Sequence, residues 1–386
     1  MLAVAAAVSL PFWFKPVHWN DPDALFYQAK VFAIRGQDEQ TAVRKVFRSP
    51  IADYLHTAEL RKPPARRQFV NAYWIDWNGK HFYHRRWVVP LMAAGVYPVL
   101  GDRSLLTVSL LGYLLLSLAL YALLRRRFSP TISAAATVVC LLAPPLRAFS
   151  FVPMTDSWGI LLETCALLAA VLVFDRGTGW LAPWAAAIAV LSFTRDDTVV
   201  PLVAVLCLLV LHRDRRSALL AGTGIAALLP SALFFGSASV RENLAFNFSD
   251  YWPPKDDSWD FVLNGYWPHV RSLLRMDLSY GTDLGWQAPL WYIGLAVAVA
   301  GVVLLIRKSV QARDPFFRLH AFALVGAATF VAFAAVYSRF REELAFLPPV
   351  AVALALAVDA AWKWYAARSR RAEPATAGRR EQLVGG

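Results

Sequence analysis

Apolar residues fill long stretches of this chain, and polar residues are confined to the gaps between them. An apolar helix of about 20 residues spans the ~30 Å hydrocarbon core of a bilayer. The pattern predicts about ten transmembrane helices, several of them shorter than that length, at residues 2–14, 104–124, 131–146, 155–174, 180–194, 198–211, 217–236, 287–306, 319–337 and 344–362. The predicted fold class is therefore an all-α polytopic membrane protein, with one membrane domain over residues 1–365.

The first long gap, residues 15–103, is predicted as an external loop. Apolar residues recur at helical spacing over residues 23–36, which predicts an amphipathic helix that can lie along the membrane surface. Aromatic residues around an Asn-Gly pair predict a small β-hairpin over residues 73–83. The stretch 87–100 is short and contains two prolines, so we expect it to be a half-inserted helix.

A second gap, residues 237–286, is predicted as another large external loop. It is rich in Trp, Tyr and Phe, which are favourable both at a lipid headgroup interface and against sugar rings, and the sequence leaves these two roles open. Residues 366–386 are polar and basic and are predicted to be a disordered cytoplasmic tail.

Composition supports the membrane assignment and gives an orientation. The chain is 58% hydrophobic and only 17% charged, with a mean hydropathy of +0.43, which excludes an ordinary soluble protein. The turns predicted on one side, with the tail from residue 363, hold 17 Lys and Arg, against four in the short turns of the other side. The positive-inside rule then predicts a protein of the cell (inner) membrane with both termini in the cytoplasm. The net charge of +12 is mostly this topology signal, with some attraction to anionic membrane lipid, and does not indicate nucleic-acid binding.

Three further features narrow the class of protein. The segment at residues 2–14 has no charged n-region and no convincing cleavage site, which favours an uncleaved anchor over a signal peptide. All three cysteines fall inside predicted spans, so neither a disulfide framework nor a cysteine metal site is indicated. The sequence has no GxGxxG or GxxxxGK[ST] phosphate loop, which argues against a nucleotide-driven pump.

In this topology a set of carboxylates at span boundaries falls on the external face. They are Asp21, Asp23, Asp156, Asp196, Asp197, Glu342 and Glu343. Asp21 and Asp23 could accept a proton from a reacting hydroxyl, or jointly hold Mg²⁺ or Mn²⁺. The alternative is that Asp23 and Asp156 only cap helices, because an aspartate at a helix start satisfies unpaired N–H groups.

Arginines accompany these acids. Arg86, Arg195, Arg339 and Arg341 could bind a phosphate group through paired N–H donors. The alternative for each is an arginine at a span end whose charged head reaches the interface.

These short motifs resemble those of the GT-C glycosyltransferases, a family that includes protein O-mannosyltransferases and lipid A aminoarabinose transferases. Asp23 stands four residues before Tyr27, as an acid does before a tyrosine in the family's first external loop. Arg86-Trp87-Val88-Val89-Pro90 is similar to the basic, apolar and proline pattern that opens the next membrane helix, and Asp156 to an acid of the second external turn. Arg339 or Arg341, ahead of Pro348-Pro349, looks like the arginine that leads into a late span.

The resemblance implies an inverting enzyme that takes a sugar from a polyprenyl-phosphate carrier to a glycan, lipid or protein acceptor on the external face. It implies Asp23 as the base, Asp21 as a second candidate, and Asp156 as its partner. It also implies donor-phosphate contacts from Tyr27 and from four arginines, Arg86, Arg195, Arg339 and Arg341. Whether Mg²⁺ or Mn²⁺ is needed stays open, because the arginines could supply the positive charge. The alternatives are a flippase or transporter of lipid-linked sugars and a non-catalytic envelope scaffold.

Overall fold

The structure is a computed structural model of the chain, and it describes residues 1–15, 17, 22–49, 86–235, 240–248, 256–334 and 341–372. All regular structure in these ranges is helical, which confirms the predicted all-α class. Six segments are long and apolar enough to cross a membrane, or seven if one bent helix pair counts as a span. The six are Val88–Leu124, Asp156–Arg176, Arg215–Phe234, Gly285–Gln311, Pro315–Phe333 and Glu342–Ser369.

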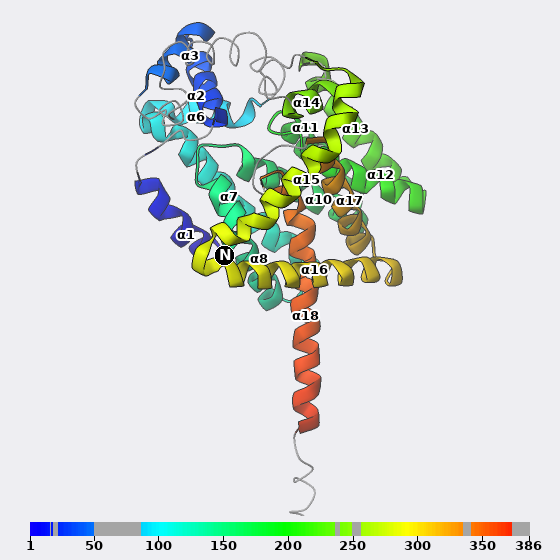
Figure 1. Cartoon of the computed structure of the whole chain (residues 1–386). Helices are drawn as coiled ribbons and strands as arrows, with labels where there is room; N and C mark the ends of the chain where they lie inside the picture. The colour runs from blue at the N-terminus through cyan, green and yellow to red at the C-terminus, as the bar shows by residue number, and fades with distance from the viewer. Residues whose placement is uncertain are drawn as a thin grey trace, which may run out of the picture.

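Each predicted span coincides with an apolar helix or helix pair (Figure 1). These are α1 (Leu2–Phe14), α7 (Ser104–Leu124), α8 (Pro130–Leu142) with α9 (Pro144–Ser150), α10 (Asp156–Arg176), α11 (Leu181–Ser192), α12 (Val199–His212), α13 (Arg215–Phe235), α16 (Ala288–Gln311), α17 (Pro315–Ala334) and α18 (Leu347–Ala372). Three apolar helices, Leu2–Phe14, Thr178–Ser192 and Val199–His212, are shorter than 18 residues. The count of ten membrane crossings is therefore not confirmed.

The predicted span at 131–146 is not one straight helix. It breaks after Leu142, and α8 and α9 are bent by 63° relative to each other. Pro144 explains the break, because a proline cannot donate a backbone hydrogen bond and keeps the preceding residue out of the helical region. Ala143 accordingly has ψ 125°.

The predicted helix near residues 23–36 is α2 (Pro22–Ile34), but it does not have a polar face directed away from the protein. Leu25, Phe26 and Tyr27 are at most 2% exposed, and the amide of Gln28 is fully buried with them. α2 packs against α3 (Glu39–Arg48) and α6 (Val88–Leu100), so it is an internal element rather than a surface helix. The predicted hairpin at 73–83 lies outside the described residues.

The predicted half-inserted helix corresponds to α6. A short 3-10 turn, η3 (Gly101–Arg103), joins it to α7, and the two helices together form the apolar segment Val88–Leu124. How deeply α6 enters a membrane stays a prediction.

The second large gap and the predicted tail are more helical than the sequence indicated. Residues 237–286 contain α14 (Val240–Phe248) and α15 (Trp259–Asp283), with η5 (Gly285–Gln287) leading into α16. α18 continues to Ala372, beyond the predicted tail start at 366, because Ala and Arg favour helix and the first strong breaker is Pro374. Figure 1 shows the end of α18 extending past the other helices.

The two ends of the helix bundle carry different polar groups. α10 packs against α7 and α11, and its C-terminal Asp175 forms ion pairs of 2.8 Å with Arg126 and 2.9 Å with Arg127. Arg127 also pairs with Asp314 at 2.8 Å. Turns predicted on the cytoplasmic side therefore meet at one end of α10, and the acidic turns meet at the other.

Candidate active site

The polar cluster is built on the N-terminus of α10. Asp156 is the first residue of this helix and its side chain is fully buried. Its carboxylate accepts hydrogen bonds from Arg195 and, at 2.9 Å, from Nε of Arg341. The N-cap residue of α10, Thr155, makes no side-chain capping bond to the helix. The carboxylate therefore joins two arginines from distant parts of the chain.

Arg195 lies at the centre of this cluster, in the short turn between α11 and α12. It donates to Asp156, to Asp197 Oδ1 at 3.1 Å and to Glu342 Oε2 at 2.7 Å, and only 5% of the residue is exposed. Gly159, one turn into α10, makes room for it, since a Cβ there would lie 2.5 Å from Arg195 Cδ. Each end of the guanidinium thus has a carboxylate partner, as a buried charge requires.

Arg341 connects the cluster to α2. Its Nη2 donates to Asp23 Oδ2 at 2.6 Å, across 318 positions of sequence, while Nε bonds to Asp156. Asp23 is near the start of α2 and is 6% exposed. One guanidinium therefore holds the two predicted catalytic acids together.

Arg86 completes the cluster on the side of α6. Its Nη1 donates to the Tyr27 hydroxyl at 2.8 Å and lies 3.6 Å from Asp23, while Nη2 lies 3.7 Å from Asp196. The Tyr27 hydroxyl is also 3.2 Å from Thr155 Oγ1. The Asp196 side chain is 45% exposed, so this side of the cluster opens outward, whereas the side of Arg195 is closed.

Buried charge sets the electrostatics of the cluster. The cluster contains three guanidiniums and four buried carboxylates. The guanidiniums are those of Arg86, Arg195 and Arg341, and the carboxylates are those of Asp23, Asp156, Asp197 and Glu342. Burial raises the pKa of Asp197 to about 6 despite the neighbouring Arg195 charge, and the negative charges of Glu342 and Asp156 act in the same direction as burial. One carboxylate of the set therefore takes up a proton at mildly acidic pH.

Two other groups beside the cluster are perturbed by burial. Lys30, on α2, donates to the backbone carbonyl of Arg86 at 3.3 Å, and its Nζ lies 4.8 Å from the Trp87 ring centroid. Burial and then the Arg86 charge lower the pKa of Lys30 to about 7. Burial also raises the pKa of Tyr27, so its hydroxyl stays protonated and can donate a hydrogen bond.

The structure brings together six of the predicted site residues, which are Asp23, Tyr27, Arg86, Asp156, Arg195 and Arg341. Asp21 and Arg339 lie outside the described residues. Asp197 and Glu342 were predicted on the same face but given no role, although both bind Arg195. The contact of Thr155 with Tyr27 joins residues 128 positions apart, so local sequence gives no signal for it.

The described residues do not fit a metal ion. They contain no group of three His, Cys, Asp or Glu side chains arranged to hold one. The oxygens of Asp23 and Asp156 instead accept hydrogen bonds from Arg341, so protein cations occupy the positions beside them. The predicted Asp21–Asp23 site for Mg²⁺ or Mn²⁺ includes Asp21, which lies outside the described residues, and it stays a prediction.

Solved structures share this arrangement of helices. ArnT from Cupriavidus metallidurans bound to undecaprenyl phosphate superposes with a TM-score of 0.54 at 16% identity, over 93% of this chain and 60% of ArnT. The Archaeoglobus fulgidus oligosaccharyltransferase in complex with Zn and sulfate gives 0.52 at 14% identity, over 92% of this chain and 48% of that protein. Both are GT-C proteins. The chain has the GT-C fold.

The similarity to these proteins is limited both in sequence and in length. No protein-family model and no curated protein matches the sequence. The chain spans about 60% of the length of ArnT and about half of the length of the oligosaccharyltransferase. The similarity of fold therefore covers only part of each of these proteins. Together with the candidate spans, the GT-C fold makes the chain a multi-pass membrane protein.

Proposed function

We propose that this protein is an integral membrane glycosyltransferase that moves a sugar from a polyprenyl-phosphate carrier to an acceptor hydroxyl. The observation that carries the proposal is the Asp23 carboxylate, held by Arg341 and next to Arg86 at the more open side of a buried charged cluster. The GT-C fold supports the same activity, because ArnT, which shares it, was solved with undecaprenyl phosphate bound.

The proposed reaction uses Asp23 as the general base. Its carboxylate removes the proton of the acceptor hydroxyl as that oxygen attacks the anomeric carbon of the donor sugar. The bond between the anomeric carbon and the phosphate oxygen breaks on the opposite face, which inverts the anomeric configuration. The electron pair of that bond leaves with the polyprenyl phosphate, whose added negative charge needs a cation and no general acid.

The arginines divide into two proposed roles. Arg86 is the best candidate for the leaving phosphate, because it lies on the outward-opening side of the cluster, next to the exposed Asp196, and Tyr27 provides a hydroxyl beside it. Arg195 and Arg341 have their donors directed at carboxylates, which favours positioning of Asp156 and Asp23 over direct phosphate contact. Arg339, outside the described residues, stays a candidate phosphate ligand by its sequence motif.

The remaining assignments follow from the sequence. The basic asymmetry of the loops supports both termini in the cytoplasm, an external active site and a location in the inner membrane. The acceptor is proposed to be an envelope glycan, a lipid or a protein. The aromatic rings of the second external segment are available to stack against its sugar rings.

The deciding experiment replaces Asp23 by Asn in purified protein supplied with a radiolabelled polyprenyl-phosphate sugar and acceptor. We expect transfer to fall by about 10²- to 10⁴-fold, the contribution of a positioned base. Asp260→Asn, an exposed acid near the start of α15, is the matched control and should keep wild-type activity. Full activity of the Asp23 variant, or turnover of a soluble nucleotide sugar without lipid, would refute the proposal. Movement of an intact sugar-lipid between leaflets would instead identify a flippase.

A further inference from the structure

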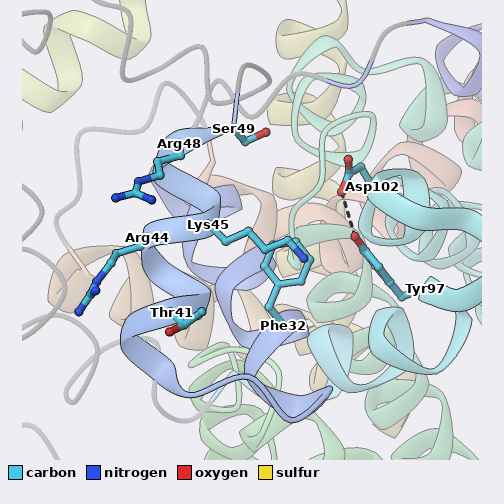
Figure 2. A pocket seen from close by; sticks show the side chains of 8 residues that line it. All are labelled: Phe32, Thr41, Arg44, Lys45, Arg48, Ser49, Tyr97 and Asp102. Carbon is cyan, nitrogen blue, oxygen red and sulfur yellow. Dashed lines mark hydrogen bonds between the residues drawn. The ribbon is translucent and has the colours of Figure 1, made fainter.

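A second basic site lies away from the charged cluster, in a pocket between α3 and α6 (Figure 2). Its volume is about 600 Å³, within the range of roughly 300–1,000 Å³ typical of small-molecule sites. Phe32 and Tyr97 are stacked edge to face within it, with ring centroids 5.6 Å apart. One side of the pocket is therefore lined by aromatic rings, and the other side is lined by cations.

The cationic side of the pocket is one stripe of α3. Arg44, Lys45 and Arg48 follow Thr41 at offsets of three, four and seven residues, which places them on one face of a helix. All three cations are exposed. The opposite, apolar side of α3, with Ala42, Val43 and Val46, is buried in the protein. The helix thus presents its charge to the pocket and its apolar side to the core.

Unlike the cations of the charged cluster, these three form no salt bridge with an acid among the described residues, although the charge of Arg44 acts on Asp38, the N-cap of α3. Arg44 donates to the neutral amide of Gln40 at 2.9 Å, and Lys45 Nζ lies 4.0 Å from the Phe32 ring centroid. Asp102 is the one carboxylate among the described lining residues, and it accepts a hydrogen bond from Tyr97 at 3.3 Å. The described lining therefore carries a net charge of +2, which favours an anion from outside the protein.

We propose that this pocket binds a phosphate group, supplied either by a phosphosugar or by the headgroup of an anionic lipid. Paired guanidiniums match the oxygens of a phosphate. The volume leaves room for a sugar-sized group next to the phosphate. The binding site itself does not depend on the proposed function.

The position of the pocket gives it a role in acceptor choice, which does rest on the proposed function. Asp23 and Phe32 lie on the same helix, nine positions apart, which corresponds to about 13 Å along its axis. An acceptor whose hydroxyl reaches Asp23 could therefore place a phosphate two or three sugar units away against α3. The pocket would select acceptors that carry this charge.

The test measures binding of two probes to full-length protein in neutral detergent. Glucose 1-phosphate, with glucose as the uncharged control, is titrated by ³¹P NMR, and phosphatidylglycerol is titrated by native mass spectrometry against phosphatidylcholine. The Arg44→Gln/Arg48→Gln variant removes two arginines four residues apart. Arg271→Gln/Arg275→Gln removes an exposed pair of the same spacing on α15 and serves as the matched control.

We expect the α3 variant to lose affinity for the bound probe by about tenfold or more, and the α15 variant to bind as wild type does. Binding of glucose 1-phosphate would identify a phosphosugar site, and binding of phosphatidylglycerol alone would identify a lipid headgroup site. Absence of binding by both probes, or an equal loss in both double variants, would overturn the proposal.

Kinetics separate this proposal from the proposed function. With a phosphorylated acceptor, the α3 variant should raise the acceptor KM about tenfold and leave kcat and the donor KM unchanged. Asp23→Asn should lower transfer by about 10²- to 10⁴-fold and leave probe binding intact. Probe binding without any transferase activity would retain the phosphate site and reject the enzyme, whereas unchanged acceptor KM in an active α3 variant would reject the role in acceptor choice.

Discussion

At the scale of single residues, Arg195 is the side chain on which most of the cluster depends. Its removal would leave Asp156, Asp197 and Glu342 without their shared cation in a buried setting. Breaking a buried ion pair by deleting one partner typically costs about 3–5 kcal/mol. We therefore predict that Arg195→Ala strongly lowers the thermal unfolding midpoint in detergent, and that Arg195→Lys lowers it less.

Arg215→Ala, at an exposed position at the start of α13, is the control and should change stability by less than about 0.5 kcal/mol. An unchanged unfolding midpoint for Arg195→Ala would show that the three carboxylates find other partners. It would also remove the reason to treat Arg195 as a positioning residue.

Lys30 gives a prediction about pH. Its pKa is lowered to about 7 in the folded protein, whereas an exposed lysine has a pKa of 10.5. Between these values the unfolded chain binds more protons, so the contribution of Lys30 to stability rises with pH from about 7 and levels off near 10.5, by at most about 1.4 kcal/mol per unit.

The measurement compares unfolding midpoints of wild type and Lys30→Met at pH 7 and pH 9. Wild type should gain stability relative to the variant at the higher pH. Lys363→Met, a largely exposed lysine paired with Asp359, should follow the wild-type pH dependence. Parallel curves for wild type and Lys30→Met would mean that Lys30 is charged throughout this range.

At the scale of helices, the crossing of α16 and α18 depends on a glycine. A Cβ at Gly301 would overlap the backbone carbonyl of Ala353, whereas Gly294 on the same helix has no atom within 4 Å of such a position. Overpacking of this kind typically costs about 1–3 kcal/mol. We predict that Gly301→Ala destabilises the protein and that Gly294→Ala is neutral or stabilises it by up to about 1 kcal/mol.

Unfolding midpoints of the two alanine variants, measured side by side, test this crossing. The comparison holds helix and substitution constant, so a difference reports only on the contact with α18. Equal midpoints would indicate that the two helices separate easily enough to admit a methyl group.

The helices themselves were largely predictable, and the errors have local causes. Apolar length located the long apolar helices, because a bilayer span leaves a run that few other elements produce. It missed α15, which is 25 residues long and lies in the predicted second external loop. The bend before Pro144 was not predicted, because one proline within an apolar run leaves the apolar pattern unchanged. The burial of α2 could not be predicted, because it depends on how the adjacent α3 folds back on α2 and on α6, which comes more than 50 residues later.

At the scale of the whole molecule, the distribution of basic residues predicts orientation. Reporter fusions at Arg126, Arg215 and Lys308 should report the cytoplasm, and fusions at Asp256 and Glu342 the external side. The ion pair of Arg127 with Asp314 already places the turns of Arg126 and Lys308 at a common end. A fusion at Glu342 that reported the same side as one at Arg126 would contradict the predicted topology.

The candidate site was predictable only in outline. Sequence placed Asp23, Asp156 and the arginines on one face, since topology alone orders the span boundaries. It could not pair them, because Asp23 and Arg341 are 318 residues apart and their contact depends on how the helices pack. The assignment of Arg195 to phosphate was reasonable from its residue type, and only its three carboxylate contacts favour a different role.

The contact between Asp23 and Arg341 also constrains biogenesis. During synthesis Asp23 and Asp156 enter the membrane region long before Arg341 leaves the ribosome, whereas Arg195 follows Asp156 by only 39 positions. The nascent chain can therefore pair Asp156 with Arg195 early, whereas Asp23 has only the 3.6 Å contact with Arg86 until its direct bond to Arg341 forms with the final helix. Pulse-labelled chains released before residue 341 should consequently be the preferred substrates of membrane quality-control proteases.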